Sequence, residues 1–94
     1  MAVRWTRTAL ANLDDLAEYI VKDNPRAAAD MVERIIAAID RLRSHPALGR
    51  PGRVPNTREL VVAGTSYIVP YRVKARSIEA LRVFHAARRW PDDF

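Results

Sequence analysis

Arg88, Arg89 and Trp90 follow a strand-like apolar stretch near the end of the chain, in the run from Arg82 to Pro91. A guanidinium presents a planar fork of donors that fits carboxylates and phosphates, and an indole ring offers a flat surface for stacking. The order of these residues predicts that cationic and aromatic side chains gather at one edge of a sheet. Such an edge favours recognition of a polyanion or of an acidic protein.

These arginines and this tryptophan could also have structural roles that involve no binding partner. A tryptophan beside a proline more often packs over the edge of a core than stacks on a ligand, and the pair Arg88-Arg89 is about as often solubilising charge. The charge distribution favours recognition. The net charge is +5, and residues 1–47 carry seven basic and seven acidic side chains against nine and four in residues 48–94. The whole excess therefore lies in the second half, and it consists almost entirely of arginine.

Other site chemistries find little support. His45 and His85 are the only histidines and cysteine is absent, so the usual metal-ligand set is missing. The glycines form no phosphate-cradling loop, and no serine sits in a nucleophile elbow. His85, inside an apolar stretch, is expected to brace the core rather than to act as a base. We therefore expect neither a metal nor a cofactor.

Length and composition restrict the class of protein. A chain of 94 residues is expected to form a single domain over residues 1–94. The absence of cysteine favours a reducing, cytoplasmic location, because small secreted domains usually need disulfides. Charged residues interrupt the early apolar ones, so no secretory signal is expected, and no apolar run is long enough to cross a membrane.

Two helices are predicted in the first half. Thr6 or Thr8 can cap the first, which carries apolar residues at helical spacing and ends near Lys22. Asn24 caps the second and Pro25 fits its first turn, since proline there loses only an N–H that has no partner. The break between them is short, so they are expected to form an antiparallel hairpin.

Four strands complete the expected fold. Residues 2–5 form the first, and residues 58–62, 67–74 and 78–86 form a three-strand meander after a loop rich in proline and glycine. The predicted class is α+β, with the helical hairpin packed on one face of a mostly antiparallel sheet. Pro70 cannot donate to a ladder, so a bulge or an unpaired edge is expected there.

Alternation assigns side chains to the two faces of this sheet. In the middle strand of the meander, Tyr67, Val69, Tyr71 and Val73 are expected to pack on the helices, and Ile68, Pro70, Arg72 and Lys74 to show on the other face. In the last strand, Leu81, Val83 and His85 are expected to point inward. The exposed set there is Arg82, Phe84, Ala86 and, by continuation, Arg88.

The order of elements and three segments resemble the RelE/ParE superfamily of toxin–antitoxin toxins, also called plasmid-stabilisation proteins. The segments are residues 58–62, residues 67–73 and residues 81–91, with a histidine, a small pair and an arginine before the tryptophan. The resemblance covers essentially the whole chain. It implies a small bacterial toxin that an acidic, ParD-like antitoxin neutralises in a hetero-oligomer.

The superfamily divides by target. RelE-like members cut mRNA on the ribosome with basic residues and a C-terminal tyrosine, whereas ParE-like members poison DNA gyrase by binding. The position after Tyr67 often carries a catalytic arginine in the ribonuclease branch, and here it is Ile68. Arg88 matches the later arginine of that branch, but no tyrosine follows it. The resemblance therefore favours a ParE-like gyrase inhibitor without established enzymatic activity.

Three hypotheses follow. In the first, the target- or antitoxin-binding residues are Arg72, Arg82, Arg88, Arg89 and Trp90. In the second, a RelE-like, ribosome-dependent endoribonuclease uses Arg88 as its catalytic residue. In the third, a degenerate copy has lost toxicity and only binds an antitoxin.

Overall fold

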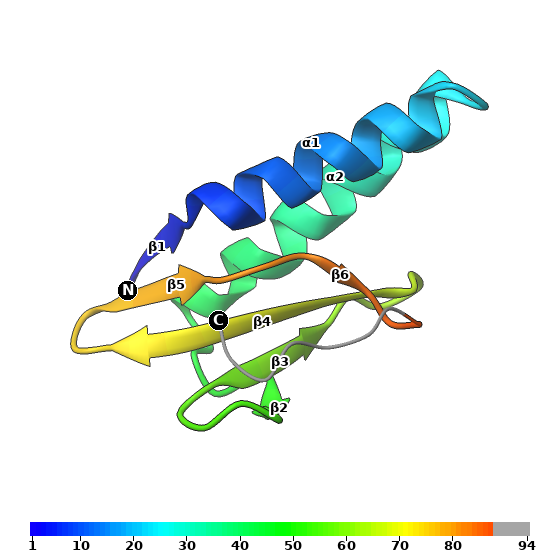
Figure 1. Ribbon diagram of the computed structural model, residues 1–94. Coiled ribbons are helices and arrows are strands. Elements are labelled where there is room, and N and C mark those ends of the chain that lie inside the picture. The colour runs from blue at the N-terminus through cyan, green and yellow to red at the C-terminus, as the bar shows by residue number, and fades with distance from the viewer. Residues whose placement is uncertain (88–94) are drawn as a thin grey trace.

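Two helices lie side by side across one face of a sheet (Figure 1). This computed structural model describes residues 1–87, so the predictions for Arg88, Arg89 and Trp90 fall outside the described residues. The predicted α+β class and element order are confirmed. The elements are β1 (Ala2–Trp5), α1 (Arg7–Val21), α2 (Pro25–Asp40), the 3-10 turn η1 (Arg41–Arg43), β2 (Arg50–Pro51), β3 (Arg58–Val61), β4 (Tyr67–Lys74), β5 (Ser77–Ala80) and β6 (Phe84–His85).

Both helices begin at the residues that local chemistry predicts. Thr6 caps α1, because its Oγ1 accepts the N–H of Ala9 at 3.1 Å. Asn24 caps α2 by accepting the N–H of Ala27 at 3.1 Å, and Pro25 fills the first turn. Among the described residues, neither helix has the length and apolar character needed to traverse a bilayer.

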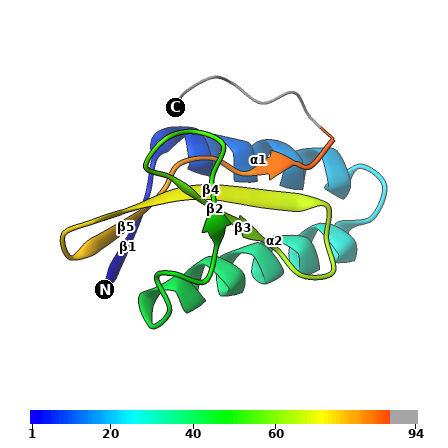
Figure 2. The same cartoon turned by 90° about the horizontal axis from the view of Figure 1, so that it is seen from below.

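The sheet order is β1-β5-β4-β3-β2, with β6 also pairing β4. The β1–β5 pair is parallel, and all other pairs are antiparallel. The parallel pair places the N-terminal strand at one edge, and β2 and β3 lie at the other. Figure 2 shows α1 running along the β6 side of β4 and α2 along the β3 side. On the face that the helices cover, α1 therefore lies toward β6 and α2 lies toward β3 (Figure 2).

The last predicted strand is not continuous. Pairing of β4 with β5 ends where Tyr71 faces Ala80, and pairing with β6 resumes where Ile68 faces Phe84. Two residues of β4 therefore oppose three residues, 81–83, which is a bulge. The prediction of one strand over residues 78–86 was wrong.

Pro70 accounts for this bulge. Its carbonyl accepts the N–H of Leu81 at 2.9 Å. In an antiparallel ladder the N–H and C=O of one residue point to the same side, and proline has no N–H to return. The ladder is therefore interrupted beside Pro70, as its position in the strand predicted.

The core lies between the hairpin and the sheet. Val69 and Tyr71 of β4 are fully buried against apolar side chains of both helices, as predicted. Val73 is 42% exposed, which corrects its predicted burial. It lies beside the β4–β5 turn, which projects beyond the helices in Figure 1, so no helix covers it.

The sheet face away from the helices, called here the far face, is closed at its centre. Ile68 and Phe84 are each only 6% exposed and face one another across β4 and β6, and Pro70 is also buried. Their predicted exposure was wrong. Phe84 does lie on the predicted face, but its partner Ile68 fills the adjacent space with apolar surface.

The predicted burial of His85 was also wrong. His85 pairs with Tyr67, so it lies on the helix side of the sheet as predicted, yet it is exposed. Leu81 and Val83, predicted to point inward with it, are buried. His85 therefore stands at the rim of the core, against the Tyr67 ring, rather than inside it.

Candidate functional site

Arg72 lies on the far face, as the alternation of β4 predicted, opposite Glu79 of β5. Its Nε is 3.9 Å from Glu79 Oε1, and Lys74 Nζ is 3.4 Å from the same oxygen. The longer separation is an ion pair and not a hydrogen bond, and the Arg72 Nε has no hydrogen-bond partner within the described residues. One carboxylate thus offsets two cations, which leaves this corner of the far face with a positive balance.

Arg82 lies over Phe84, with its Cζ 5.8 Å from the centre of the ring. That distance allows a cation–π contact. Because Phe84 is buried against Ile68, the guanidinium stands at the border of an apolar patch. The described part of the predicted surface therefore consists of Arg72 in β4 and Arg82 in the bulge between β5 and β6.

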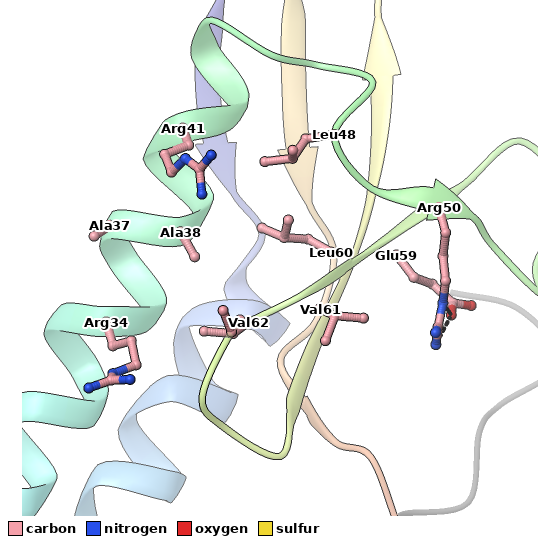
Figure 3. A pocket seen from close by; sticks show the side chains of 11 residues that line it. Arg34, Ala37, Ala38, Arg41, Leu48, Arg50, Glu59, Leu60, Val61 and Val62 are labelled. Carbon is pink, nitrogen blue, oxygen red and sulfur yellow. Dashed lines mark hydrogen bonds and ion pairs between the residues drawn. The ribbon is translucent and has the colours of Figure 1, made fainter.

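A groove of about 440 Å³ between α2 and β3 also carries arginines, and it was not predicted from the sequence. Figure 3 shows Arg34 and Arg41 on the helix side and Arg50 on the opposite side, with the side chains of β3 between them. Apolar residues add to the lining, among them Leu48 and Val61, which are 42% and 51% exposed. The groove is thus cationic at its borders and apolar at its floor.

The outer edge of β3 is only partly paired. Val62 donates its N–H to Tyr67 O at 3.0 Å, so the backbone of its neighbour Val61 points the other way, toward the groove. On that side β2 pairs only with Arg58 and Glu59. Within residues 1–87 the outward N–H and C=O of Val61 therefore have no strand partner. An extended segment from another protein would find a ladder to continue.

Among residues 1–87, Glu59 is the one acidic residue that lines the groove, and it is 2% exposed. Its Oε1 accepts from both Nε and Nη2 of Arg50 at 3.1 Å, and its Oε2 accepts the backbone N–H of Arg53 at 2.9 Å. The carboxylate is therefore fully engaged in holding β2 against β3. It does not oppose an acidic ligand in the groove.

Tyr71 fixes the loop that leads into the groove. Its hydroxyl donates to Pro46 O at 2.7 Å and accepts the Gly49 N–H at 2.8 Å. Burial raises the pKa of the Tyr71 hydroxyl above 10.0, although the Gly49 hydrogen bond and the nearby Arg58 charge act in the opposite direction. A Cβ on Gly49 would lie 2.6 Å from the Tyr71 ring, so only glycine fits this approach. Leu48 and Arg50 are positioned through this contact.

The positions of Arg72 and Arg82 on the far face were predicted from the sequence, whereas the groove was not. Arg34 and Arg41 are seven residues apart and so share one helix face, which is a visible signal. Arg50 lies in a loop of unpredictable path, and its approach to them depends on the Glu59 contact and on the Tyr71 anchor. No local pattern reveals that arrangement.

The similarity to known proteins extends over nearly the whole chain, including the far face and the groove. Residues 3–90 match the family described as "ParE toxin of type II toxin-antitoxin system, parDE". The chain is 53% identical to the toxin candidate Y4kP of Sinorhizobium fredii, over 95% of this chain and 92% of that protein. It is 38% identical to the toxin RelE2 of Caulobacter vibrioides, over 92% and 96% of the two chains. A solved chain of the chromosomal ParDE toxin–antitoxin system from P. aeruginosa superposes with a TM-score of 0.82 at 33% identity, covering 90% of this chain and 95% of that one.

Proposed function

Because the chain belongs to the ParE family of type II toxin–antitoxin toxins, we propose that it inhibits DNA gyrase by binding and that a cognate acidic, ParD-like antitoxin neutralises it. Gyrase acts in the cytoplasm, so the proposal also places the protein there. The enzymatic alternative is mRNA cleavage on the ribosome.

The observation that supports binding over cleavage is the chemistry of the far face. Cleavage of RNA through its 2′-hydroxyl requires a general base and a general acid as well as cationic stabilisation. The position after Tyr67 is the buried Ile68, and the imidazole of His85 lies on the opposite side of the sheet. In residues 1–87, the cations of this face include Arg72, Lys74 and Arg82, which suit electrostatic attraction to a partner.

The target is tested by separating gyrase inhibition from translation arrest. Purified protein is expected to inhibit supercoiling by gyrase, and induction without antitoxin is expected to cause a DNA-damage response while bulk translation continues. Replacement of both Arg72 and Arg82 by alanine should weaken the inhibition. Arg76→Ala serves as the control. Arg76 is exposed in the β4–β5 turn, so this substitution removes a positive charge outside the proposed surface.

The relative named RelE2 motivates a second candidate, the ribosome-dependent endoribonuclease. Prompt translation arrest with codon-phased mRNA cuts would favour it over gyrase inhibition. In that case Arg88→Ala should abolish cleavage and leave antitoxin binding intact. Unchanged growth at high levels of folded protein would instead favour a module that only binds an antitoxin.

The groove supports the antitoxin part of the proposal. Arg34 and Arg41 attract an acidic segment, whereas Arg50 is already paired with Glu59. The apolar floor and the free edge at Val61 suit an extended segment. Reversing the charge of both Arg34 and Arg41 to glutamate should weaken binding of the purified cognate antitoxin at least about tenfold, measured by calorimetry. Arg26→Glu, on the exposed start of α2 outside the groove, is the control. Equal losses from the groove and control variants would mean that only net charge matters.

A further inference from the structure

A second cavity, of about 340 Å³, opens between α1 and the strands β4 and β6. Figure 2 shows this side of the sheet bordered by α1, whereas the arginine groove lies along α2 and β3. We call it the α1 pocket. It is lined by Asn12, Asp15, Leu16 and Tyr19 from one face of α1, and by Tyr67, Val83 and His85 from the sheet.

Aromatic rings form much of its wall. Tyr67 and His85 meet edge to face, with ring centres 5.5 Å apart and planes at 82°. Tyr19 is 72% exposed, so most of its side chain is accessible to a ligand. The faces of aromatic rings carry negative electrostatic potential and attract cations. The wall is therefore suited to a flat or cationic group.

The polar groups of the α1 pocket differ in whether they already have a hydrogen-bond or ion-pair partner. Asn12 is already engaged, because its Oδ1 accepts the Val83 N–H at 3.1 Å. The His85 Nδ1 accepts the Ala87 N–H at 3.2 Å, so this ring nitrogen is also engaged. Asp15 forms no ion pair with any residue from 1 to 87, although the chain has 16 lysines and arginines. Its carboxylate is the unused charge of the pocket.

We propose that the α1 pocket receives an arginine side chain of a partner protein. A guanidinium can form two parallel hydrogen bonds with a carboxylate and at the same time stack on aromatic faces. Asp15 offers the carboxylate, and Tyr19, Tyr67 and His85 offer the rings. The pocket is thus opposite in character to the two cationic surfaces, and the protein presents complementary sites for basic and acidic parts of its partners.

The carboxylate decides between this ligand and others that also stack. An anionic group would be repelled by Asp15. The base of a nucleotide would stack equally well, but the phosphates of that nucleotide would lie near the same negative charge. A lysine would satisfy the carboxylate but has no plane to place against the rings. The combination of charge and flat surface therefore favours a guanidinium.

The test is a nuclear magnetic resonance titration of the full-length protein with the tripeptide N-acetyl-Gly-Arg-Gly-amide. We expect shifts of the Tyr19, Tyr67 and His85 ring signals, with weak affinity because the probe makes only one contact. Asp15→Asn should weaken binding about fivefold or more. Asp14→Asn is the matched control, because Asp14 is the neighbouring exposed acid on α1 and does not line the pocket. Tyr19→Phe should bind normally and Tyr19→Ala should bind less well.

Four results would overturn the proposal. The first is equal binding of the same peptide with citrulline, which has the shape of arginine without its charge. The second is equal weakening by Asp14→Asn and Asp15→Asn, which would indicate a general electrostatic effect. The third is tighter binding of guanosine monophosphate than of the arginine peptide, which would make the pocket a nucleobase site. An absence of shifts with the arginine peptide would refute it directly.

Discussion

Replacement of Tyr71 by phenylalanine tests whether the contact between β4 and the loop before β2 stabilises the fold. The ring stays in the core, so the change removes only the hydroxyl and its two hydrogen bonds. The Gly49 N–H is buried and loses its partner, which costs about 1–3 kcal/mol. The Pro46 carbonyl is only partly buried and can turn to water, which costs less, about 0.5–1 kcal/mol. We expect a total loss of roughly 1.5–4 kcal/mol.

The assay is urea unfolding followed by circular dichroism, with the midpoint and the slope fitted together. In a domain of this size the expected loss lowers the melting temperature by roughly 10–20 °C. Tyr19→Phe is the control, because Tyr19 is 72% exposed and makes no side-chain hydrogen bond within residues 1–87. The same loss in both variants, or a change below about 0.5 kcal/mol for Tyr71→Phe, would refute the role given to this hydroxyl.

The same hydroxyl predicts a dependence of stability on pH. Burial raises the Tyr71 pKa in the folded protein above its ordinary value of 10.0. The folded state therefore holds this proton more tightly than the unfolded state does, and the contribution is fully present below about pH 10. It is lost as the pH rises through the folded pKa. The difference in stability between the wild type and Tyr71→Phe, measured across this pH range, isolates the contribution of the Tyr71 hydroxyl.

Two further substitutions test the contacts that position the surfaces. Thr6→Ala should cost about 1 kcal/mol in urea unfolding, because Thr6 Oγ1 caps α1 and also donates to Leu81 O at 2.8 Å, whereas Thr8→Ala should change little. Glu59→Gln should cost about 1–2 kcal/mol, because the buried carboxylate loses its charge-assisted bonds to Arg50. A Glu59→Gln protein as stable as the wild type would show that the Arg50–Glu59 pair sets the conformation of the loop that carries Arg50 without stabilising the fold.

The helices were predictable because their signals are local. A cap at Thr6 or Asn24 and the apolar spacing behind it act within one or two turns, and tertiary packing has little to add. The strands β3 and β4 were predictable for a similar reason, since alternation and turn residues mark them. The order of strands was not. Nothing near residues 2–5 indicates that this segment lies parallel to β5 at an edge of the sheet.

Burial on the far face and the groove depend on contacts between distant residues. Ile68 alternates as an exposed residue would, yet it is buried and pairs with Phe84, a residue distant in the sequence. Val73 alternates as a core residue would, and its exposure follows from where the helices end. Arg50 enters the groove through Glu59, nine residues further along the chain. The roles of Arg88, Arg89 and Trp90 stay predictions.

The bulge beside Pro70 links the fold to the functional proposals. The inward residues of β5 are Ile78 and Ala80, both even-numbered. Had the ladder continued in that register, Phe84 would lie on the helix side and His85 on the far face. The extra residue among 81–83 exchanges them, so that Phe84 faces Ile68 and His85 faces Tyr67.

That exchange has chemical consequences on both sides of the sheet. It places an apolar ring beneath the Arg82 guanidinium, on the face where a ribonuclease would need a base. It also moves the imidazole to the α1 side, where His85 and Tyr67 form an aromatic wall near Asp15. A missing N–H at Pro70 therefore contributes to two surfaces of opposite character. The far face is left suited to binding, and the α1 pocket gains the rings that a guanidinium requires.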